Sequence, residues 1–286
     1  MIITKLIGGL GNQMFQYAAG AALARRLGVP LYVDARAFES YDRHALCLDV
    51  FGVPMHQVES RPVRRGGWWK RWLGGLGGGA ATGPRVYKEK AFTFDPEVLG
   101  LQGDVYLDGY WQSERYFEDC ASYIRELFTV RVEPSQTNRE YLQAVAGDRS
   151  VSLHVRRGDY VTDAGANAVH GTCDADYYAR ALACVEQRAG PSLQIFVFSD
   201  DPDWAEGMFR DDPRVRVMRH NDTLTNYEDL RLMSACRHHV LANSTFSWWG
   251  AWLDGRSDST VIAPQRWFRD ERMDARDLVP QRWIRL

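Results

Sequence analysis

The alternation of apolar and polar positions near the start of the chain predicts a strand, a helix and a second strand. Ile2–Ile7 is a short apolar run, as in a buried strand, and a glycine turn follows at Gly8–Gly11. Over Asn12–Leu27 apolar residues recur at helical spacing, and Gly28 is placed to end that helix. Leu31–Asp34 is then expected to be a second strand. This order favours a parallel sheet.

The same rhythm begins again in the second half of the chain. The expected strands are Ser150–Val155, Leu193–Ser199, His239–Ala242 and Val261–Ala263, and the expected helices are Ala175–Ala189, Asn226–Ala235 and Ser247–Leu253. Between the halves, Asp119–Val130 has helical spacing, whereas the polar stretch Glu133–Arg149 is expected to be the connection. The pattern predicts an α/β protein with two domains, 1–145 and 146–286, as a length of 286 residues allows.

Residues 61–88 break this pattern. They carry arginines, lysines and tryptophans without an acidic residue, and their second half is rich in glycine. Such a segment buries too little surface to offset the entropy of ordering it, so we expect a mobile loop. Two interpretations stay open. The loop makes a peripheral contact with an anionic membrane, or its tryptophans pack back onto the N-terminal domain.

Composition narrows the classes of function. A net charge of −2 argues against a nucleic-acid-binding protein, and 45% hydrophobic with 25% charged residues is typical of a globular protein. No stretch reaches the ~20 uninterrupted apolar residues of a spanning helix. The five scattered cysteines form no CxxC pair, so neither a zinc site nor a disulfide framework is expected. We expect a cytoplasmic protein, either free or at the inner face of the membrane.

The densest polar cluster follows the expected strand Ser150–Val155. It contains His154, the adjacent arginines Arg156 and Arg157, and Asp159. Ligands bind beyond the carboxyl ends of strands in a parallel sheet, and one guanidinium group can donate two parallel hydrogen bonds to a phosphate. We interpret this turn as a polyanion site, and the alternative is a surface turn with solvated arginines.

Two further turns follow expected strands. Asp200 and Asp201 are suited to hydrogen bonds from a guanine edge or a ribose, or they merely cap the next helix. Adjacent aspartates at a cap give poor metal geometry, so no metal site is expected. The second turn, 243–247, leads into a helix whose free N–H groups and dipole favour a phosphate. Its alternative is a well-capped helix with a tryptophan core face, and both readings are compatible.

The first glycine turn lacks the G-x-G-x-x-G spacing of dinucleotide-binding folds. Its glycines allow another backbone or a sugar to approach closely. Asn12 and Gln13 then direct amide groups into the same space.

Five segments in this order resemble glycosyltransferase family 11, the α-1,2-fucosyltransferases: GGLGNQMFQYA, GYWQSERYF, HVRRGDY, YEDLRLMS and NSTFSWWGAWL. The resemblance runs from Ile2 to Trp267, and the arginine turn is also similar to the GDP-fucose site of α-1,6- and protein O-fucosyltransferases. It implies a GT-B-like fold of two Rossmann-type domains facing a cleft. GDP-fucose would bind the C-terminal half and a galactoside acceptor the N-terminal half. Residues 61–88 lie outside the shared motifs.

By matching positions, the resemblance implies that Arg156 is the essential phosphate-binding residue. The donor site would also include His154, Arg157, Asp200, Asp201, Asn243, Ser244, Thr245, Phe246 and Ser247, and the acceptor side Asn12, Gln13, Gln112 and Glu114. The implied reaction inverts GDP-β-L-fucose to an α-fucoside on the 2-hydroxyl of a terminal galactose, in surface-polysaccharide synthesis. No cofactor or metal is expected, since arginines would stabilise the departing pyrophosphate.

Asp159 is the expected catalytic base, with Asn12 as an alternative that positions the acceptor. Two rival functions stay open: a transferase for another GDP-sugar such as GDP-mannose, and a carbohydrate-binding protein without catalytic activity.

Overall fold

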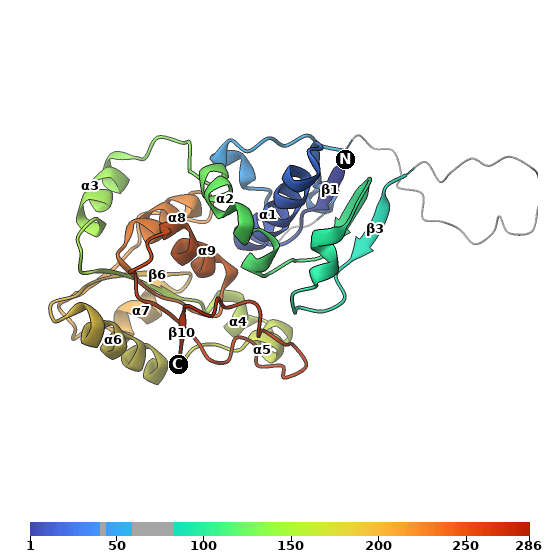
Figure 1. Ribbon diagram of the computed structural model, residues 1–286. Helices are drawn as coiled ribbons and strands as arrows, with labels where there is room; N and C mark the ends of the chain where they lie inside the picture. Colours follow the sequence, from blue (N-terminus) through green and yellow to red (C-terminus); the bar gives the residue numbers. More distant parts are fainter. Residues whose placement is uncertain (41–43, 59–82) are drawn as a thin grey trace, which may run out of the picture.

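The computed structural model describes residues 1–40, 44–58 and 83–286, which form two α/β lobes side by side (Figure 1). Across those ranges no helix has the length and apolarity needed to cross a membrane. Most of the basic, tryptophan-rich segment, residues 61–82, lies outside the described residues. Both interpretations of that segment therefore remain predictions.

The N-terminal lobe contains a four-stranded parallel sheet in the order β2–β1–β4–β3. Its strands are β1 (Ile2–Lys5), β2 (Leu31–Asp34), β3 (Arg85–Lys88) and β4 (Val105–Asp108). Helix α1 (Leu10–Leu27) confirms the predicted strand–helix–strand unit. It ends at Gly28, whose φ of 63° lies in the left-handed region that glycine adopts without strain. Single-turn 3-10 helices η1 (Arg36–Glu39), η2 (Leu48–Phe51) and η4 (Pro96–Gly100) lie in the connections.

Strand β3 corrects the expectation that the loop extends to residue 88. It pairs in parallel with β4, matching Val86 with Tyr106 and Tyr87 with Leu107. Tyr87 is buried and Val86 is exposed, as expected for an edge strand with one covered face. The strand is short and basic, and its partner is distant in sequence, so local pattern alone does not predict it.

The C-terminal lobe contains a six-stranded parallel sheet in the order β10–β9–β8–β5–β6–β7. Its strands are β5 (Ser150–Val155), β6 (Gln194–Ser199), β7 (Val215–Val217), β8 (His238–Val240), β9 (Val261–Ala263) and β10 (Ile284–Arg285). Its helices are α4 (Gly158–Thr162), α5 (Ala164–His170), α6 (Ala175–Ala189), α7 (Pro202–Met208), α8 (Asn226–Ala235) and α9 (Thr245–Asp254). The predicted strands and helices of this half are confirmed, with small shifts at their ends.

The segment between the two sheets contains more structure than the sequence pattern predicts. The turns η5 (Glu114–Tyr116) and η6 (Glu118–Cys120) precede α2 (Ala121–Leu127). The stretch expected to be a plain connection instead forms helix α3 (Gln136–Val145). Ser135 caps it by accepting a hydrogen bond from the Asn138 backbone N–H, and Val145 is buried. The proposed boundary at 145/146 falls between α3 and β5 and remains a prediction.

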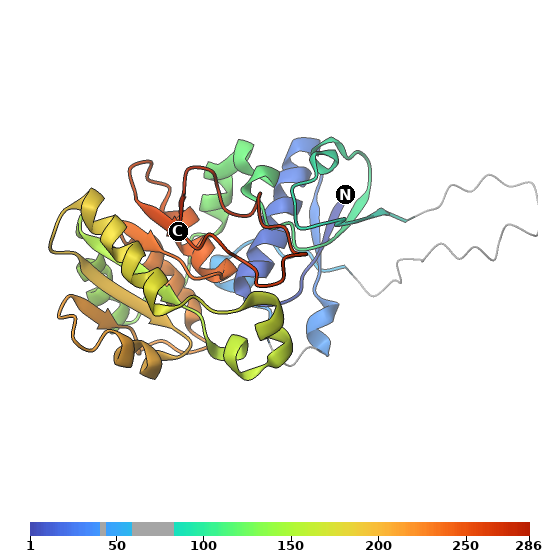
Figure 2. The ribbon, with the colours of Figure 1, turned by 90° about the horizontal axis from the view of Figure 1, so that it is seen from below.

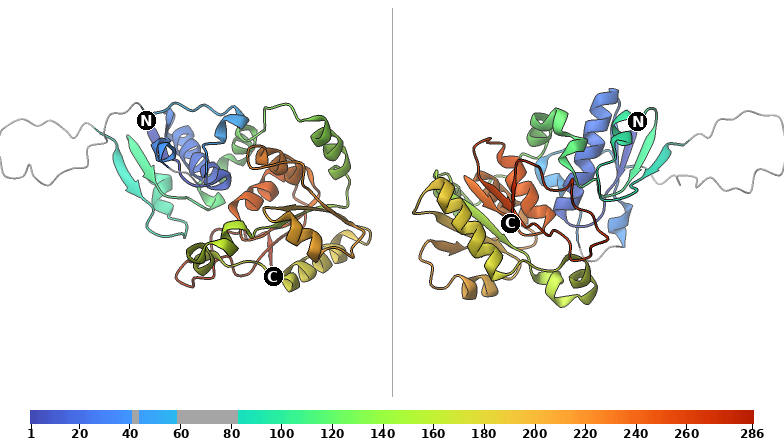
Figure 3. Two further views of the ribbon diagram at one scale, coloured as in Figure 1. Left: turned by 180° about the vertical axis from the view of Figure 1, so that it is seen from behind. Right: turned by 60° about the horizontal axis from the view of Figure 1, so that its bottom comes forward.

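One of the hydrophobic clusters contains residues of both lobes. The ring of Phe15 in α1 lies 4.4 Å from the ring of Trp248 and 5.0 Å from that of Trp249, both in α9. The Trp249 indole N–H donates a hydrogen bond to the Gly11 carbonyl at 3.0 Å. The chain after β9 also returns toward the N-terminal lobe (Figures 2 and 3), where the Asp277 carbonyl accepts a hydrogen bond from Ser113. The lobes are thus held together through both α9 and the C-terminal segment.

Candidate functional site

The arginine turn lies at the carboxyl end of the central strand β5. Arg156 donates a 2.6 Å hydrogen bond to Asp159, and a second guanidinium nitrogen lies 3.0 Å from an Asp200 oxygen. The guanidinium also lies over the Tyr160 ring, 5.3 Å from its centroid. Burial of Arg156 disfavours its positive charge and lowers its pKa. The negative charges of Asp200 and Asp159 have the larger combined effect, so the pKa of Arg156 is raised. A cation held by two carboxylates from different segments is well oriented for an anionic ligand.

The neighbouring Arg157 is bound differently. Its Nε donates to Asp201 at 3.1 Å, and its guanidinium lies 4.2 Å from the Trp204 ring centroid. Asp201 also caps α7 by accepting a hydrogen bond from the Trp204 backbone N–H, as the capping alternative predicted. Asp200 instead accepts a 2.8 Å hydrogen bond from the Arg157 backbone N–H and so shapes the arginine turn.

His154 precedes this turn and is buried. Burial, together with the nearby Arg156, lowers the pKa of His154 to about 3, so its ring is neutral at physiological pH. Its Nδ1 makes no hydrogen bond within the described part of the chain. The ring centroid lies 5.9 Å from that of Phe246, the second residue of α9. His154 therefore lies between the arginine turn and α9, and its neutral ring can form a hydrogen bond to a ligand through Nδ1 but carries no positive charge.

The turn between β8 and α9 lies beside the arginine turn, because Tyr160 donates a hydrogen bond to the Asn243 carbonyl at 3.4 Å. Ser244 caps α9 by accepting a hydrogen bond from the Phe246 backbone N–H. Thr245 donates through Oγ1 to the Asn12 side-chain oxygen at 3.1 Å. The first turn of α9 thus lies between the arginine turn and the start of α1.

Asn12 connects three segments that are distant in sequence. Its Oδ1 accepts hydrogen bonds from Thr245 Oγ1 and, at 3.0 Å, from Gln112 Nε2. Since both donors bind the oxygen, the amide nitrogen faces away from them and is hydrogen-bonded to no other described residue. This contact requires close packing of α1 on α9. A Cβ at Gly11 would lie 2.6 Å from the Thr245 carbonyl carbon, so only glycine fits there.

Gln112 is presented by a strained turn. Trp111 is fully buried and has a φ of 57°, a conformation that costs a bulky residue about 1–3 kcal/mol. The Glu89 carboxylate stabilises the turn by accepting 2.8 Å hydrogen bonds from the backbone N–H groups of Tyr110 and Trp111. Burial raises the pKa of Glu89, and these two hydrogen bonds oppose that rise. Sequence analysis missed Glu89, which lies outside every recognisable motif.

Several predicted site residues have their side chains bound to backbone groups. The Asn243 amide donates to the carbonyls of His170, Gly171 and Trp267. Ser247 is buried and bonded to the carbonyls of Ala242 and Ser244. Gln13 is buried, donates to the carbonyls of Gly8 and Ala45, and accepts from the Cys47 N–H. These three side chains brace the turns that carry the site, and their contact with ligands remains a prediction.

Glu114 is separated from the other acceptor-side residues. Its carboxylate accepts hydrogen bonds from the Trp252 indole at 2.9 Å and from Arg282. Trp252 lies near the end of α9, seven residues after Thr245, which corresponds to ~10 Å along a helix. The structure therefore brings Asn12 and Gln112 together but places Glu114 elsewhere.

His170 is a second residue that the sequence patterns did not indicate. Its ring stacks on Tyr160 with centroids 4.6 Å apart, and Phe268 lies 5.6 Å away. Burial lowers the pKa of His170, so it is neutral at physiological pH. It is the last residue of the short helix α5, and a single histidine there carries no sequence signal of its own.

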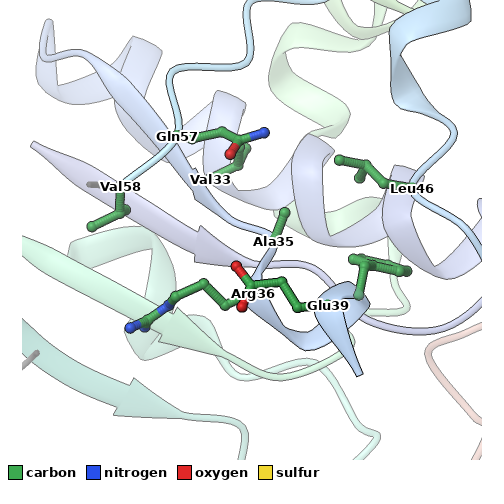
Figure 4. A pocket seen from close by; sticks show the side chains of 8 residues that line it. Val33, Ala35, Arg36, Glu39, Leu46, Gln57 and Val58 are labelled. Carbon is green, nitrogen blue, oxygen red and sulfur yellow. The ribbon is translucent and has the colours of Figure 1, made fainter. Parts of the chain in front are cut away.

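Two cavities lie outside this site. One of about 280 Å³ lies after β2 (Figure 4), and one of about 330 Å³ lies at the C-terminal end of α9. Neither is lined by Arg156 or Asn12. We place the site where polar side chains meet at strand and helix ends, and not at a cavity, because polar groups bind and activate a substrate whereas an empty volume does not. Within the ranges described, no three His, Cys, Asp or Glu residues converge as metal ligands.

Comparison with known proteins identifies relatives over nearly the whole chain. A model of glycosyl transferase family 11 matches residues 90–286. An α-1,2-colitosyltransferase of Escherichia coli is 33% identical over 279 residues, covering 95% of this chain and 93% of that protein. The E. coli O-antigen biosynthesis glycosyltransferase WbnK is 30% identical, covering 92% of this chain and 93% of that protein. Human galactoside α-(1,2)-fucosyltransferase 1 is 27% identical, covering 90% of this chain and 66% of that protein.

Among solved structures, that of a mutant of Arabidopsis thaliana FUT1 in complex with GDP is similar, with a TM-score of 0.50 and 11% identity. The match covers 92% of this chain and 69% of that one. It bears on the fold alone, and the predicted α/β, GT-B-like fold is confirmed.

Proposed function

Because the chain belongs to glycosyltransferase family 11, we propose that it is an inverting α-1,2-fucosyltransferase that uses GDP-fucose. It moves fucose to the 2-hydroxyl of a terminal galactose in a surface polysaccharide. The observation that carries this proposal is a chain of contacts: Arg156 lies over Tyr160, which is hydrogen-bonded to the turn before α9, and the first turn of α9 is hydrogen-bonded to Asn12. The cation and the helix N-terminus of the C-terminal lobe suit the diphosphate of a nucleotide sugar, and the amide of Asn12 in the N-terminal lobe suits a hydroxyl acceptor.

The leaving diphosphate gains negative charge as the sugar–phosphate bond breaks. Arg156 is oriented before the ligand arrives, and a preoriented donor lowers the barrier because it needs no reorganisation during the reaction. The N-terminus of α9 adds the positive end of its dipole. We assign this work to protein groups, with no metal or cofactor.

The acceptor hydroxyl must lose a proton. In this proposal Arg156 is hydrogen-bonded to Asp159 in the unliganded enzyme, and the diphosphate replaces Asp159 as its partner when the donor binds. The released carboxylate, whose side chain is 41% exposed, then accepts the proton. Asn12 is the alternative participant: its amide nitrogen would orient the acceptor hydroxyl without taking the proton.

A second candidate donor is GDP-colitose. It is favoured by the 33% identity to an α-1,2-colitosyltransferase. Colitose lacks one ring hydroxyl of fucose, so the two donors fit the same site chemistry.

The test is incubation with GDP-fucose or GDP-colitose and a panel of β1,3- and β1,4-linked galactosides. Product linkage is determined by NMR and mass spectrometry. We expect an α-1,2 linkage to galactose with at least one donor. Transfer to another hydroxyl, or no transfer from either donor, would contradict the proposal.

A further inference from the structure

The cavity of about 330 Å³ at the C-terminal end of α9 is lined by neither Arg156 nor Asn12. Its walls come from three parts of the chain: η6 with α2, the end of α9 with the loop after it, and the last residues around Arg282. We refer to it as the α9-end cavity. Its volume lies within the ~300–1,000 Å³ of typical ligand pockets, so the charges on its walls decide which ligand suits it.

Two of the carboxylates that line the α9-end cavity already have cationic partners. Glu114 accepts a hydrogen bond from Arg282 and another, at 2.9 Å, from the Trp252 indole N–H. Asp254 accepts a hydrogen bond from Arg256. Neither carboxylate is therefore free to neutralise a further cation.

Arg125 of α2 lies in the same cavity and forms no ion pair within the described part of the chain. Its Nε donates to the Trp252 carbonyl at 3.2 Å, which caps the end of α9 but uses only one of five N–H groups. Its guanidinium lies 4.3 Å from the Trp252 ring centroid, so the ring holds the guanidinium in place. The two terminal nitrogens are hydrogen-bonded to no described residue.

Arg282 is the second cation of the α9-end cavity. Burial and then the positive charge of Arg282 lower the pKa of Arg125, and the weaker effects of Glu114 and Asp254 do not compensate. Arg282 donates to Glu114 through Nη1 alone, which leaves its other N–H groups without a partner among the described residues. Glu118 also lines the cavity, but it is exposed, so water screens its charge.

Two arginines that repel each other and keep free N–H groups suit an anion with several oxygens. A carboxylate has two oxygens and satisfies one guanidinium fork, whereas a phosphate can accept hydrogen bonds from both arginines at once. We propose that the α9-end cavity binds a phosphate group between Arg125 and Arg282, either as free phosphate or as part of a small monoester. The site is separate from the arginine turn, and the inference does not depend on the proposed function.

The test is isothermal titration calorimetry with inorganic phosphate and with glucose 1-phosphate. Arg125→Gln and Arg282→Gln should each raise Kd at least about tenfold, since each removes hydrogen bonds from a cation to the anion. Arg272→Gln removes the same charge from a side chain that is 90% exposed and outside the cavity, and it should leave Kd unchanged. Arg156→Lys, at the arginine turn, should also leave Kd unchanged. Thermal unfolding without ligand confirms that the variants fold.

Tighter binding of glucose 1-phosphate assigns the site to a monoester, and equal binding assigns it to free phosphate. No saturable binding of either ligand to the wild type overturns the proposal, as does an unchanged Kd in both cavity variants. Binding that GDP displaces and Arg156→Lys weakens would place the phosphate in the arginine turn and overturn it as well. Because Arg125 caps α9, the decisive variant is Arg282→Gln, whose side chain is 52% exposed.

Discussion

Arg156→Lys is the substitution that most sharply tests the role of the arginine turn. Arg156 uses two different guanidinium nitrogens to reach Asp159 at 2.6 Å and Asp200 at 3.0 Å, while its plane lies over Tyr160. Lysine keeps the positive charge, but its single ammonium cannot reproduce this planar fork. The substitution therefore separates charge from orientation.

We expect kcat/KM to fall by at least ~10²-fold, equivalent to at least ~2.7 kcal/mol of transition-state stabilisation, as for loss of one preoriented donor. Most of the loss should appear in kcat, because the diphosphate charge is greatest in the transition state. The fold should survive, since the side chain is 27% exposed and the charge is retained.

The assay is GDP release with GDP-fucose and a galactoside at saturating and limiting concentrations. Arg272→Lys is the control, because Arg272 forms a surface pair with Asp270 and its side chain is 90% exposed. It should behave as wild type. Near wild-type kcat/KM for Arg156→Lys, with intact thermal unfolding, would refute the assignment of Arg156 to the leaving diphosphate.

Four further outcomes are expected. Gly11→Ala should destabilise the protein by about 1–3 kcal/mol in urea unfolding, since its Cβ would clash with the backbone of α9. Gly147→Ala, whose Cβ would meet no atom of the described residues within 4 Å, should change stability by less than ~0.5 kcal/mol, and equal effects of the two substitutions would refute the packing argument. Trp111→Ala should cost about 3–5 kcal/mol, measured in the same way, because it empties a fully buried position. Burial raises the pKa of Asp229 to about 6, above its unfolded value of 3.8, so wild type should lose up to about 3 kcal/mol relative to Asp229→Asn as pH rises from 4 through 6. A stability difference independent of pH would contradict that reasoning. Transfer activity should persist in EDTA, and a full loss restored by Mn²⁺ or Mg²⁺ would assign a metal role to the protein's carboxylates.

Long periodic runs made most of the fold predictable. The β5 strand and the α6 helix have the predicted bounds, because a strand buried on both faces and an amphipathic helix leave strong local patterns. The β3 strand and α3 helix were missed for different reasons. The partner of β3 is remote in sequence, and α3 buries only a narrow stripe of an otherwise polar segment.

The site was predictable to the extent that strand ends in a parallel sheet gather ligand-binding groups. That rule placed Arg156 beside the turn that carries Thr245. It could not distinguish side chains that face a ligand from those that brace the backbone, because both uses favour Asn, Gln and Ser. Asn243 donates to three backbone carbonyls, a use that only the folded structure reveals. Glu89 was also not predicted, because its partners are backbone N–H groups that only the folded structure brings to it.

A crystal structure of the protein with GDP bound is the most direct test of the central claim, that the donor diphosphate lies between the arginine turn and the first turn of α9. We expect phosphate oxygens within hydrogen-bonding distance of Arg156 and beside Thr245, with the contact between Arg156 and Asp159 released. GDP bound elsewhere, with Arg156 still paired to Asp159 and Asp200, would contradict it.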